Sequence, residues 1–202
     1  MPDLRLVLFI DAQNTYRCAR ESFFGPGDFH TYGQFDPIKL GQLIAGRGGP
    51  SGAGVELQQV RVYTGRPDSS RDPRSYGAHM KQCSAWTRSG VEVIWRTLRY
   101  PPPGTAERPQ EKGIDVALAV DFVAMAADGA YDIGVIFSTD TDLVPPLEYV
   151  AKRFPSQRYP AVAAWRSNTG NRRLFSRQVN LWCHYLDRAD YEIVADLTDY
   201  NR

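Results

Sequence analysis

Cysteine is scarce in this sequence of 202 residues, with only Cys18, Cys83 and Cys183, which lie far apart. An odd number of widely spaced cysteines is typical of free thiols in a reducing compartment, and the absence of a C-x-x-C pair argues against a structural zinc site. No apolar run approaches the roughly 20 residues that a membrane-spanning helix needs. The N-terminus also lacks the basic and then apolar pattern of a signal peptide. We therefore predict a cytoplasmic protein that has no membrane partner.

Three well-known sequence motifs are missing as well. The glycine-rich segment 46–54 is not followed by Gly-Lys-Ser/Thr, so it is not a P-loop. No Gly-x-Gly-x-x-Gly follows the first apolar run, which excludes a dinucleotide-dependent oxidoreductase of the usual kind. No Gly-x-Ser-x-Gly is present, which excludes an α/β-hydrolase that uses a serine nucleophile.

The net charge of +1 conceals an uneven distribution of charge along the chain. Residues 61–112 contain ten Lys or Arg against five Asp or Glu, whereas residues 113–155 contain two against seven. Residues 156–180 contain five basic residues and no acid. An acidic block between basic segments suits a metal-dependent enzyme that acts on a polyanion. Charges that alternate over a solvated surface explain the same pattern equally well.

Apolar runs alternate with amphipathic segments through most of the chain. The segments that we predict as strands are residues 4–10, 55–64, 91–99, 133–138 and 161–165. Those that we predict as helices are residues 14–24, 36–45, 75–89, 114–127 and 143–152, with a further helix near 172–186 before a short apolar stretch at 191–194. Alternating strands and helices predict an α/β fold with a mostly parallel sheet of about five strands, covered by helices on both faces. We expect one domain over residues 1–202, with a core at about 4–165 and a C-terminal segment at 166–202.

Four aspartates are expected at one edge of this sheet. Asp11 directly follows the first strand, Asp140 and Asp142 follow the strand 133–138, and Asp115 lies in the first turn of the helix 114–127. Three of them have a local explanation: Asp11 could order a turn, Asp115 could complement its helix dipole, and Asp142 could cap the next helix. Ligands of open parallel sheets bind beyond the carboxyl ends of the strands, where like charges repel unless a cation separates them. Hard oxygen ligands suit Mg²⁺ or Mn²⁺.

The segments that carry these aspartates resemble the three motifs of NYN domains, which belong to the PIN-like nuclease superfamily. The matching segments are Phe9-Ile10-Asp11-Ala12-Gln13-Asn14, Lys112-Gly113-Ile114-Asp115-Val116-Ala117-Leu118-Ala119-Val120-Asp121 and Phe137-Ser138-Thr139-Asp140-Thr141-Asp142-Leu143. The resemblance runs from about Leu4 to Ala164. In the family, glycine is usual at the positions of Ala12 and Thr139, so this chain keeps the polar residues but changes the backbone that carries them.

The resemblance implies a Rossmann-like, PIN-like fold and a ribonuclease that depends on Mg²⁺ or Mn²⁺ and acts on RNA. It implies that Asp11, Asp115, Asp140 and Asp142 are catalytic. The first three would be the metal ligands, and Asp142 would be a fourth carboxylate or would hold a metal-bound water. The residues expected to bind substrate are Asn14, Lys112, Ser138, Thr139 and Arg17. For Asn14, Ser138 and Thr139, orienting the carboxylates is the alternative. No histidine base is needed in this chemistry, so His30, His79 and His184 are expected to be dispensable.

Other substrate contacts are suggested by position alone. The loop 100–113, which carries Arg108 and Lys112, is a candidate flap over the substrate. Tyr16, Tyr76 and Trp165 are candidates for stacking on unpaired bases, with a place in the core or on the ordinary surface as the alternative. Asp121 follows Asp115 by six positions, so on a regular helix it points away and is expected outside the metal site.

Two other functions fit parts of the pattern. The first is a nucleic-acid-binding or scaffold protein on the same fold without catalysis. The second is a phosphatase with Asp11 as nucleophile, but the Asp-x-Asp-x-Thr pattern of such enzymes has its second acid where this chain has Gln13. As a protein partner, either a second copy of the chain or a regulatory protein is left open.

Overall fold

The computed structural model describes residues 3–49, 52–102, 109–167 and 172–202. The strands are β1 (Leu4–Asp11), β2 (Val55–Arg66), β3 (Glu92–Thr97), β4 (Ile133–Phe137), β5 (Tyr159–Trp165) and β6 (Trp182–Leu186). The helices are α1 (Ala12–Phe23), α2 (Pro37–Ala45), α3 (Pro73–Arg88), α4 (Ile114–Ala127), α5 (Val144–Arg153) and α6 (Arg188–Val194), with a short 3-10 helix η2 (Thr141–Leu143).

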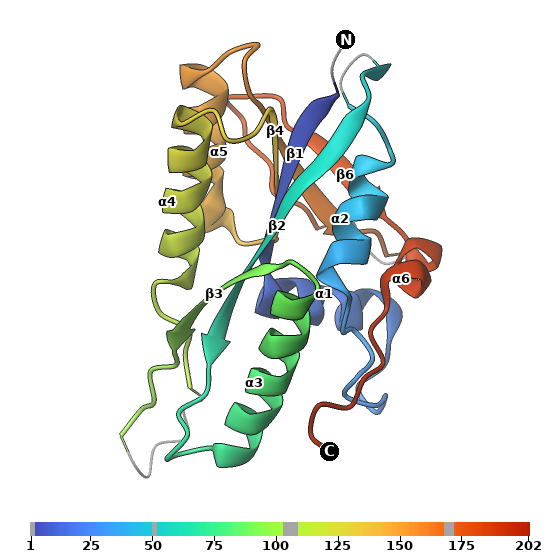
Figure 1. The fold of residues 1–202 in the computed structure, drawn as a ribbon, viewed down its shortest axis with the longest axis vertical. Coiled ribbons are helices and arrows are strands. Elements are labelled where there is room, and N and C mark those ends of the chain that lie inside the picture. Colours follow the sequence, from blue (N-terminus) through green and yellow to red (C-terminus); the bar gives the residue numbers. More distant parts are fainter. Residues whose placement is uncertain (1–2, 50–51, 103–108, 168–171) are drawn as a thin grey trace.

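All six strands run parallel in one sheet, in the order β3-β2-β1-β4-β5-β6 (Figure 1). This is the strand order of Rossmann folds. The chain moves outward from β1 to β3 on one side, then returns to place β4 against β1 and moves outward again to β6. The neighbours β1 and β4 therefore form the switch point, and their carboxyl ends lie side by side. The predicted α/β fold is confirmed.

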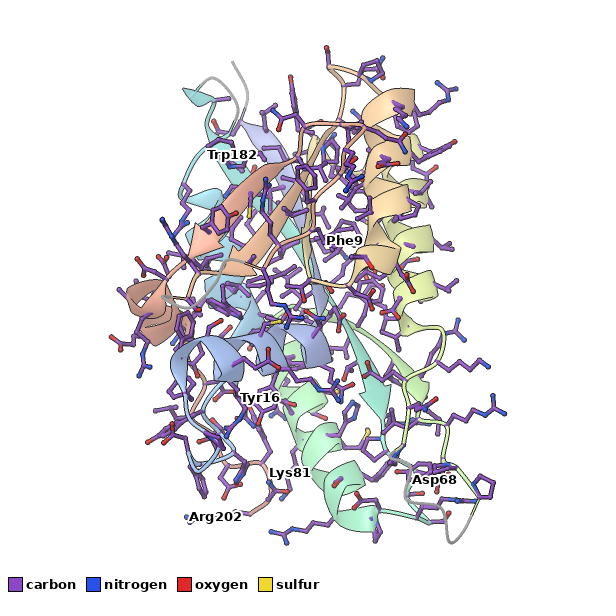
Figure 2. All side chains as sticks on the ribbon, turned by 180° about the vertical axis from the view of Figure 1, so that it is seen from behind. Phe9, Tyr16, Asp68, Lys81, Trp182 and Arg202 are labelled. Carbon is purple, nitrogen blue, oxygen red and sulfur yellow. The ribbon has the colours of Figure 1, made fainter. Side chains whose placement is uncertain are left out.

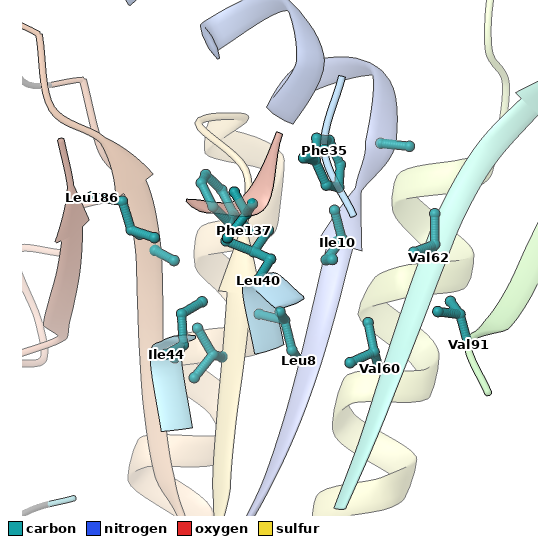
Figure 3. Close-up of a cluster of buried hydrophobic side chains, with 14 of the residues drawn as sticks. Leu8, Ile10, Phe35, Leu40, Ile44, Val60, Val62, Val91, Phe137 and Leu186 are labelled. Carbon is teal, nitrogen blue, oxygen red and sulfur yellow. The ribbon is translucent and has the colours of Figure 1, made fainter. Parts of the chain in front are cut away.

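Strand β1 is apolar on both of its faces, and helices cover both faces of the sheet and so remove these side chains from water. Leu8 and Ile10 point to one face, where they pack with the buried residues of α1, α2, α3 and α6. Figure 3 shows Leu40 and Ile44 of α2 in this cluster. Val7 and Phe9 point to the opposite face, where they pack with the buried residues of α4 and α5. A strand that is buried on both faces fixes the position of the residue at its end, which is Asp11.

The C-terminal segment differs from the prediction. Residues 182–186 form the edge strand β6 where a helix was predicted, and the stretch 191–194 lies within helix α6. Trp182 and Tyr185 favour extended backbone, and this preference prevails in β6. The signal for α6 is local: Asp187 accepts hydrogen bonds from the N–H groups of Ala189 and Asp190, and the Asp190 carboxylate accepts one from the N–H of Asp187.

The described part of the chain shows two further features that bear on the sequence predictions. None of its helices is both long enough and apolar enough to cross a bilayer. Its three cysteines are all unpaired, as predicted.

Candidate active site

Asp11 is the last residue of β1 and also caps the N-terminus of α1. One carboxylate oxygen accepts a hydrogen bond from the N–H of Asn14 at 3.1 Å, and the other accepts one from the Ser138 hydroxyl, also at 3.1 Å. The Ser138 hydroxyl oxygen in turn accepts a hydrogen bond from the N–H of Asp140 at 3.1 Å. Only 4% of Asp11 is exposed, so these bonds hold a buried carboxylate between the ends of β1 and β4.

A second set of hydrogen bonds ties the first turn of α1 to the end of β4. The amide oxygen of Asn14 accepts bonds from the N–H of Thr139 at 2.9 Å and from its hydroxyl at 3.2 Å. The Thr15 hydroxyl donates to the carbonyl oxygen of Phe137 at 3.0 Å. Asn14, Ser138 and Thr139 therefore lie where they hold the turn that carries Asp11 and Asp140. Their contact with a substrate stays a prediction.

Asp140 follows β4 and caps η2, because its carboxylate accepts a hydrogen bond from the N–H of Asp142 at 3.0 Å. Asp142 had a possible role as cap of the next helix, but α5 has no side-chain cap and follows Leu143. Asp142 is instead an exposed residue of η2. Both carboxylates lie at the switch point of the sheet.

Asp115 lies in the first turn of α4, which begins after Gly113. Gly113 has a φ of +77°, a left-handed conformation that glycine adopts without steric cost. Burial raises the pKa of Asp115, and the charges of Asp140 and Asp142 raise it further. Asp115 and Asp142 also line one hollow of the surface, so α4 brings its aspartate close to an acid that follows β4.

Glu111 is an acid of the site that the sequence analysis did not single out. Its carboxylate accepts a hydrogen bond from the N–H of Gly65, at the end of β2, at 2.6 Å. A Cβ at Gly65 would lie only 2.6 Å from the Glu111 side chain, so the glycine makes this approach possible. Burial raises the pKa of Glu111, and the charge of Asp115 adds to the effect. The available signal was its position one residue before Lys112, at the start of the second motif.

Burial and the neighbouring acids both disfavour a negative charge on Asp11. Burial raises the pKa of Asp11 to about 7, and the charges of Glu111 and Asp115 contribute, against the hydrogen bonds from Asn14 and Ser138. Chemically, these carboxylates are the hard oxygen donors that Mg²⁺ and Mn²⁺ prefer. Within the described residues, however, no three Asp, Glu, His or Cys side chains are grouped closely enough to hold a metal ion as they stand. The donor set therefore fits a divalent ion, but the side chains would have to turn inward to bind it.

The basic residues that we predicted to bind substrate differ in their surroundings. With the Gln13 amide turned so that its nitrogen donates to Glu111 at 3.1 Å, its oxygen accepts from the Arg17 guanidinium at 3.0 Å. Arg17 therefore lies at the edge of the site. Lys112 is exposed and forms no ion pair with a described residue. Arg108, in the candidate flap, lies outside the described residues.

Residues expected outside the site are held elsewhere. Asp121 accepts hydrogen bonds from the Arg61 guanidinium and the Tyr63 hydroxyl, both at 2.8 Å, which confirms that it lies apart from the acids. Burial lowers the pKa of His79 and of His184 to about 4, so both imidazoles are neutral near pH 7.

Comparisons with known proteins identify the family and the fold. A sequence model of the NYN domain matches residues 5–154, which contain the four aspartates and Glu111. Among curated proteins, none matches the chain significantly. A crystal structure of a protein of unknown function from Vibrio parahaemolyticus is similar, with a TM-score of 0.51 and 19% identity over 80% of this chain and 82% of that chain. At that identity the likeness concerns the fold alone. Because the family match covers most of the chain, the chain belongs to the NYN domain family of the PIN-like nuclease superfamily.

Proposed function

We propose that this protein is a metal-dependent ribonuclease that hydrolyses phosphodiester bonds of RNA in the cytoplasm. The observation that supports the proposal is that Asp11 and Asp140 follow the neighbouring strands β1 and β4, with Asp115 in the first turn of α4. Nuclease-type folds of this family provide the context. Three mutually repelling acids at one edge are costly for the fold by themselves, and a bound cation removes that cost.

In this proposal Asp11, Asp115 and Asp140 hold Mg²⁺ or Mn²⁺, with Asp142 and Glu111 beside them. When bound, the ion supplies Lewis-acid chemistry at the scissile phosphate. The side chains and backbone of the protein hold the ligands in place. Ser138 and the N–H of Asn14 fix the Asp11 carboxylate through hydrogen bonds at 3.1 Å. Arg17 and Lys112, at the rim, attract the phosphates of the substrate.

A second candidate function is binding of RNA without cleavage. One observation favours it: the described acids do not form a complete metal group as they stand. The two candidates differ in what they require of the acids. A binding protein needs no divalent ion, whereas a nuclease of this kind is inactive without one.

The test is incubation of the purified protein with a mixed-sequence single-stranded RNA and a matched DNA, in Mn²⁺, in Mg²⁺ or in EDTA. We expect cleavage of the RNA with either metal and none in EDTA. Asp140→Asn should abolish cleavage because it removes a ligand, and Asp128→Asn, an exposed residue at the far end of α4, should not. Folded wild-type protein that cuts nothing with either metal would contradict the nuclease proposal and favour the binding function.

A further inference from the structure

The outer ends of β2 and β3 carry an arginine stacked between aromatic rings. The Arg66 guanidinium lies 3.3 Å from the centroid of the Trp95 ring and 5.9 Å from that of Tyr76. Trp95 is 44% exposed, so part of its ring is open to solvent. A second pair lies nearby, with Arg71 at 5.4 Å from the Tyr100 ring. We call Arg66, Tyr76 and Trp95 the Trp95 platform.

The flank around the platform has more arginines than acids. None of its five arginines forms an ion pair with a carboxylate of the described residues; they are Arg66, Arg71, Arg74, Arg96 and Arg99. The two acids of the adjoining loop accept hydrogen bonds from that loop and from α3. Asp68 accepts the N–H of Ser70, and Asp72 caps α3 by accepting the N–H of Ser75. The charges of Arg71 and Arg74 reach these two carboxylates without direct contact, and Arg66 donates to the Thr97 hydroxyl. The flank therefore keeps guanidinium groups that can attract phosphates.

The Trp95 platform adjoins the acids of the candidate active site. Arg66 follows Gly65, whose N–H donates to Glu111. On the neighbouring strand, Arg96 follows Trp95, and a Cβ at Gly113 would lie 3.7 Å from the Arg96 side chain. Figure 1 shows the ends of β2 and β3 beside the start of α4, where Asp115 lies. Successive residues of a strand point to opposite faces, so the platform lies on the face of α3, and Arg96 lies on the face of α4. A polymer held at the acids can reach the platform across the ends of β2 and β3.

We propose that the Trp95 platform stacks on an unpaired base of the substrate, while the surrounding arginines hold its phosphates, so that the protein selects single-stranded RNA. The proposal rests on RNA being the substrate of the proposed function. A base offers its face only when it is not already stacked in a duplex, and aromatic rings with arginine are the usual partners of such a face.

Other aromatic side chains are less suited to this role. Trp165 was a stacking candidate from sequence, but the structure buries it to 3% exposure, and its indole N–H donates to the carbonyl oxygen of Thr15 at 3.0 Å. Trp165 is therefore a core residue, which was the alternative to stacking, because β5 is an inner strand of the sheet. Trp182 is 71% exposed, but it lies on β6, at the opposite edge of the sheet from β3. Figure 2 shows Trp182 at the end of the molecule away from Asp68, which lies in the loop next to the platform. Trp182 is therefore a matched control.

The test is fluorescence anisotropy of a labelled single-stranded RNA in EDTA, where no cleavage interferes. We expect Trp95→Leu, which keeps an apolar side chain but loses the ring, to weaken binding about tenfold. Trp95→Phe should bind within about threefold of wild type because it keeps a ring, and Trp182→Leu should bind as wild type does. Arg71→Ala, at an exposed position, should lower the slope of log affinity against log salt by about 0.7. A duplex of the same sequence should bind more weakly than the single strand.

Several results would overturn the platform. One is a folded Trp95→Leu protein that binds the single strand as tightly as wild type, and another is an equal loss of affinity in Trp95→Leu and Trp182→Leu. The others are a duplex that binds as well as the single strand, and no binding of the single strand at all. The outcome is separate from that of the cleavage assay. Binding that needs Trp95, without any cleavage in metal, supports the platform and contradicts the nuclease. If the protein cleaves RNA but Trp95→Leu binds RNA as tightly as wild type, the result supports the nuclease proposal and contradicts the platform proposal.

Discussion

Replacing Asp11 with asparagine is expected to slow RNA cleavage about a thousandfold in saturating Mn²⁺. The variant removes one negative oxygen from the centre of the acid cluster, and losing about 4 kcal/mol of transition-state stabilisation corresponds to that factor. The shape of the site is retained. An amide oxygen still accepts the N–H of Asn14, and an amide nitrogen can donate to the Ser138 oxygen. Single-turnover cleavage of a labelled RNA measures the effect.

The control for Asp11→Asn is Asp128→Asn, which removes an equal charge from an exposed position away from the site. That control should cleave at the wild-type rate. Circular dichroism should show both variants folded. A folded Asp11→Asn protein that cleaves within a few-fold of wild type would remove Asp11 from the catalytic site, and with it the arrangement proposed around the end of β1.

The stability of the metal-free protein is expected to depend on pH through the same carboxylate. Asp11 has an ordinary pKa of 3.8, which burial and neighbouring acids raise to about 7 in the folded chain. Between these values the folded state binds more protons than the unfolded state, so stability falls as the pH rises from about 4 to about 7 and then stays low. The full difference is worth about 4 kcal/mol of unfolding free energy, as an order of magnitude.

Urea denaturation in EDTA, at pH 5 and at pH 8, measures this dependence. Folding also shifts the pKa values of Glu111, Asp115, His79 and His184, so the informative quantity is the difference in unfolding free energy between wild type and Asp11→Asn. Asparagine carries no charge to bury. We therefore expect the variant to gain stability relative to wild type between pH 5 and pH 8. If the difference in unfolding free energy between wild type and Asp11→Asn is the same at both pH values, burial and the neighbouring acids do not raise the pKa of Asp11.

The inner strands and the aspartates at their ends could be predicted because local pattern and burial agree there. The run before Asp11 is apolar on both faces, which places it in the centre of a parallel sheet, and the same holds for the strand before Asp140. Because both acids follow the carboxyl ends of parallel strands, they are expected at the same edge of the sheet.

Other features depend on contacts that the sequence pattern does not encode. The edge strand β6 is only partly buried and short, so it lacks the apolar run that identifies β1. Glu111 joins the site through the N–H of Gly65, more than forty residues away in the chain. The stacking of Arg66 on Trp95 likewise joins β2 to β3. Such long-range pairs follow from the register of strands rather than from local spacing.

Calorimetric titration of Mn²⁺ into the protein near pH 7.5 tests whether these acids form a site for a divalent ion. We expect one or more specific sites in wild type and in Asp128→Asn. In Asp11→Asn and Asp115→Asn we expect an affinity lower by at least about tenfold, as is usual when a ligand or its close support is lost. Wild-type protein that binds no Mn²⁺, or that binds it only as tightly as the two site variants do, would show that the acids do not form such a site.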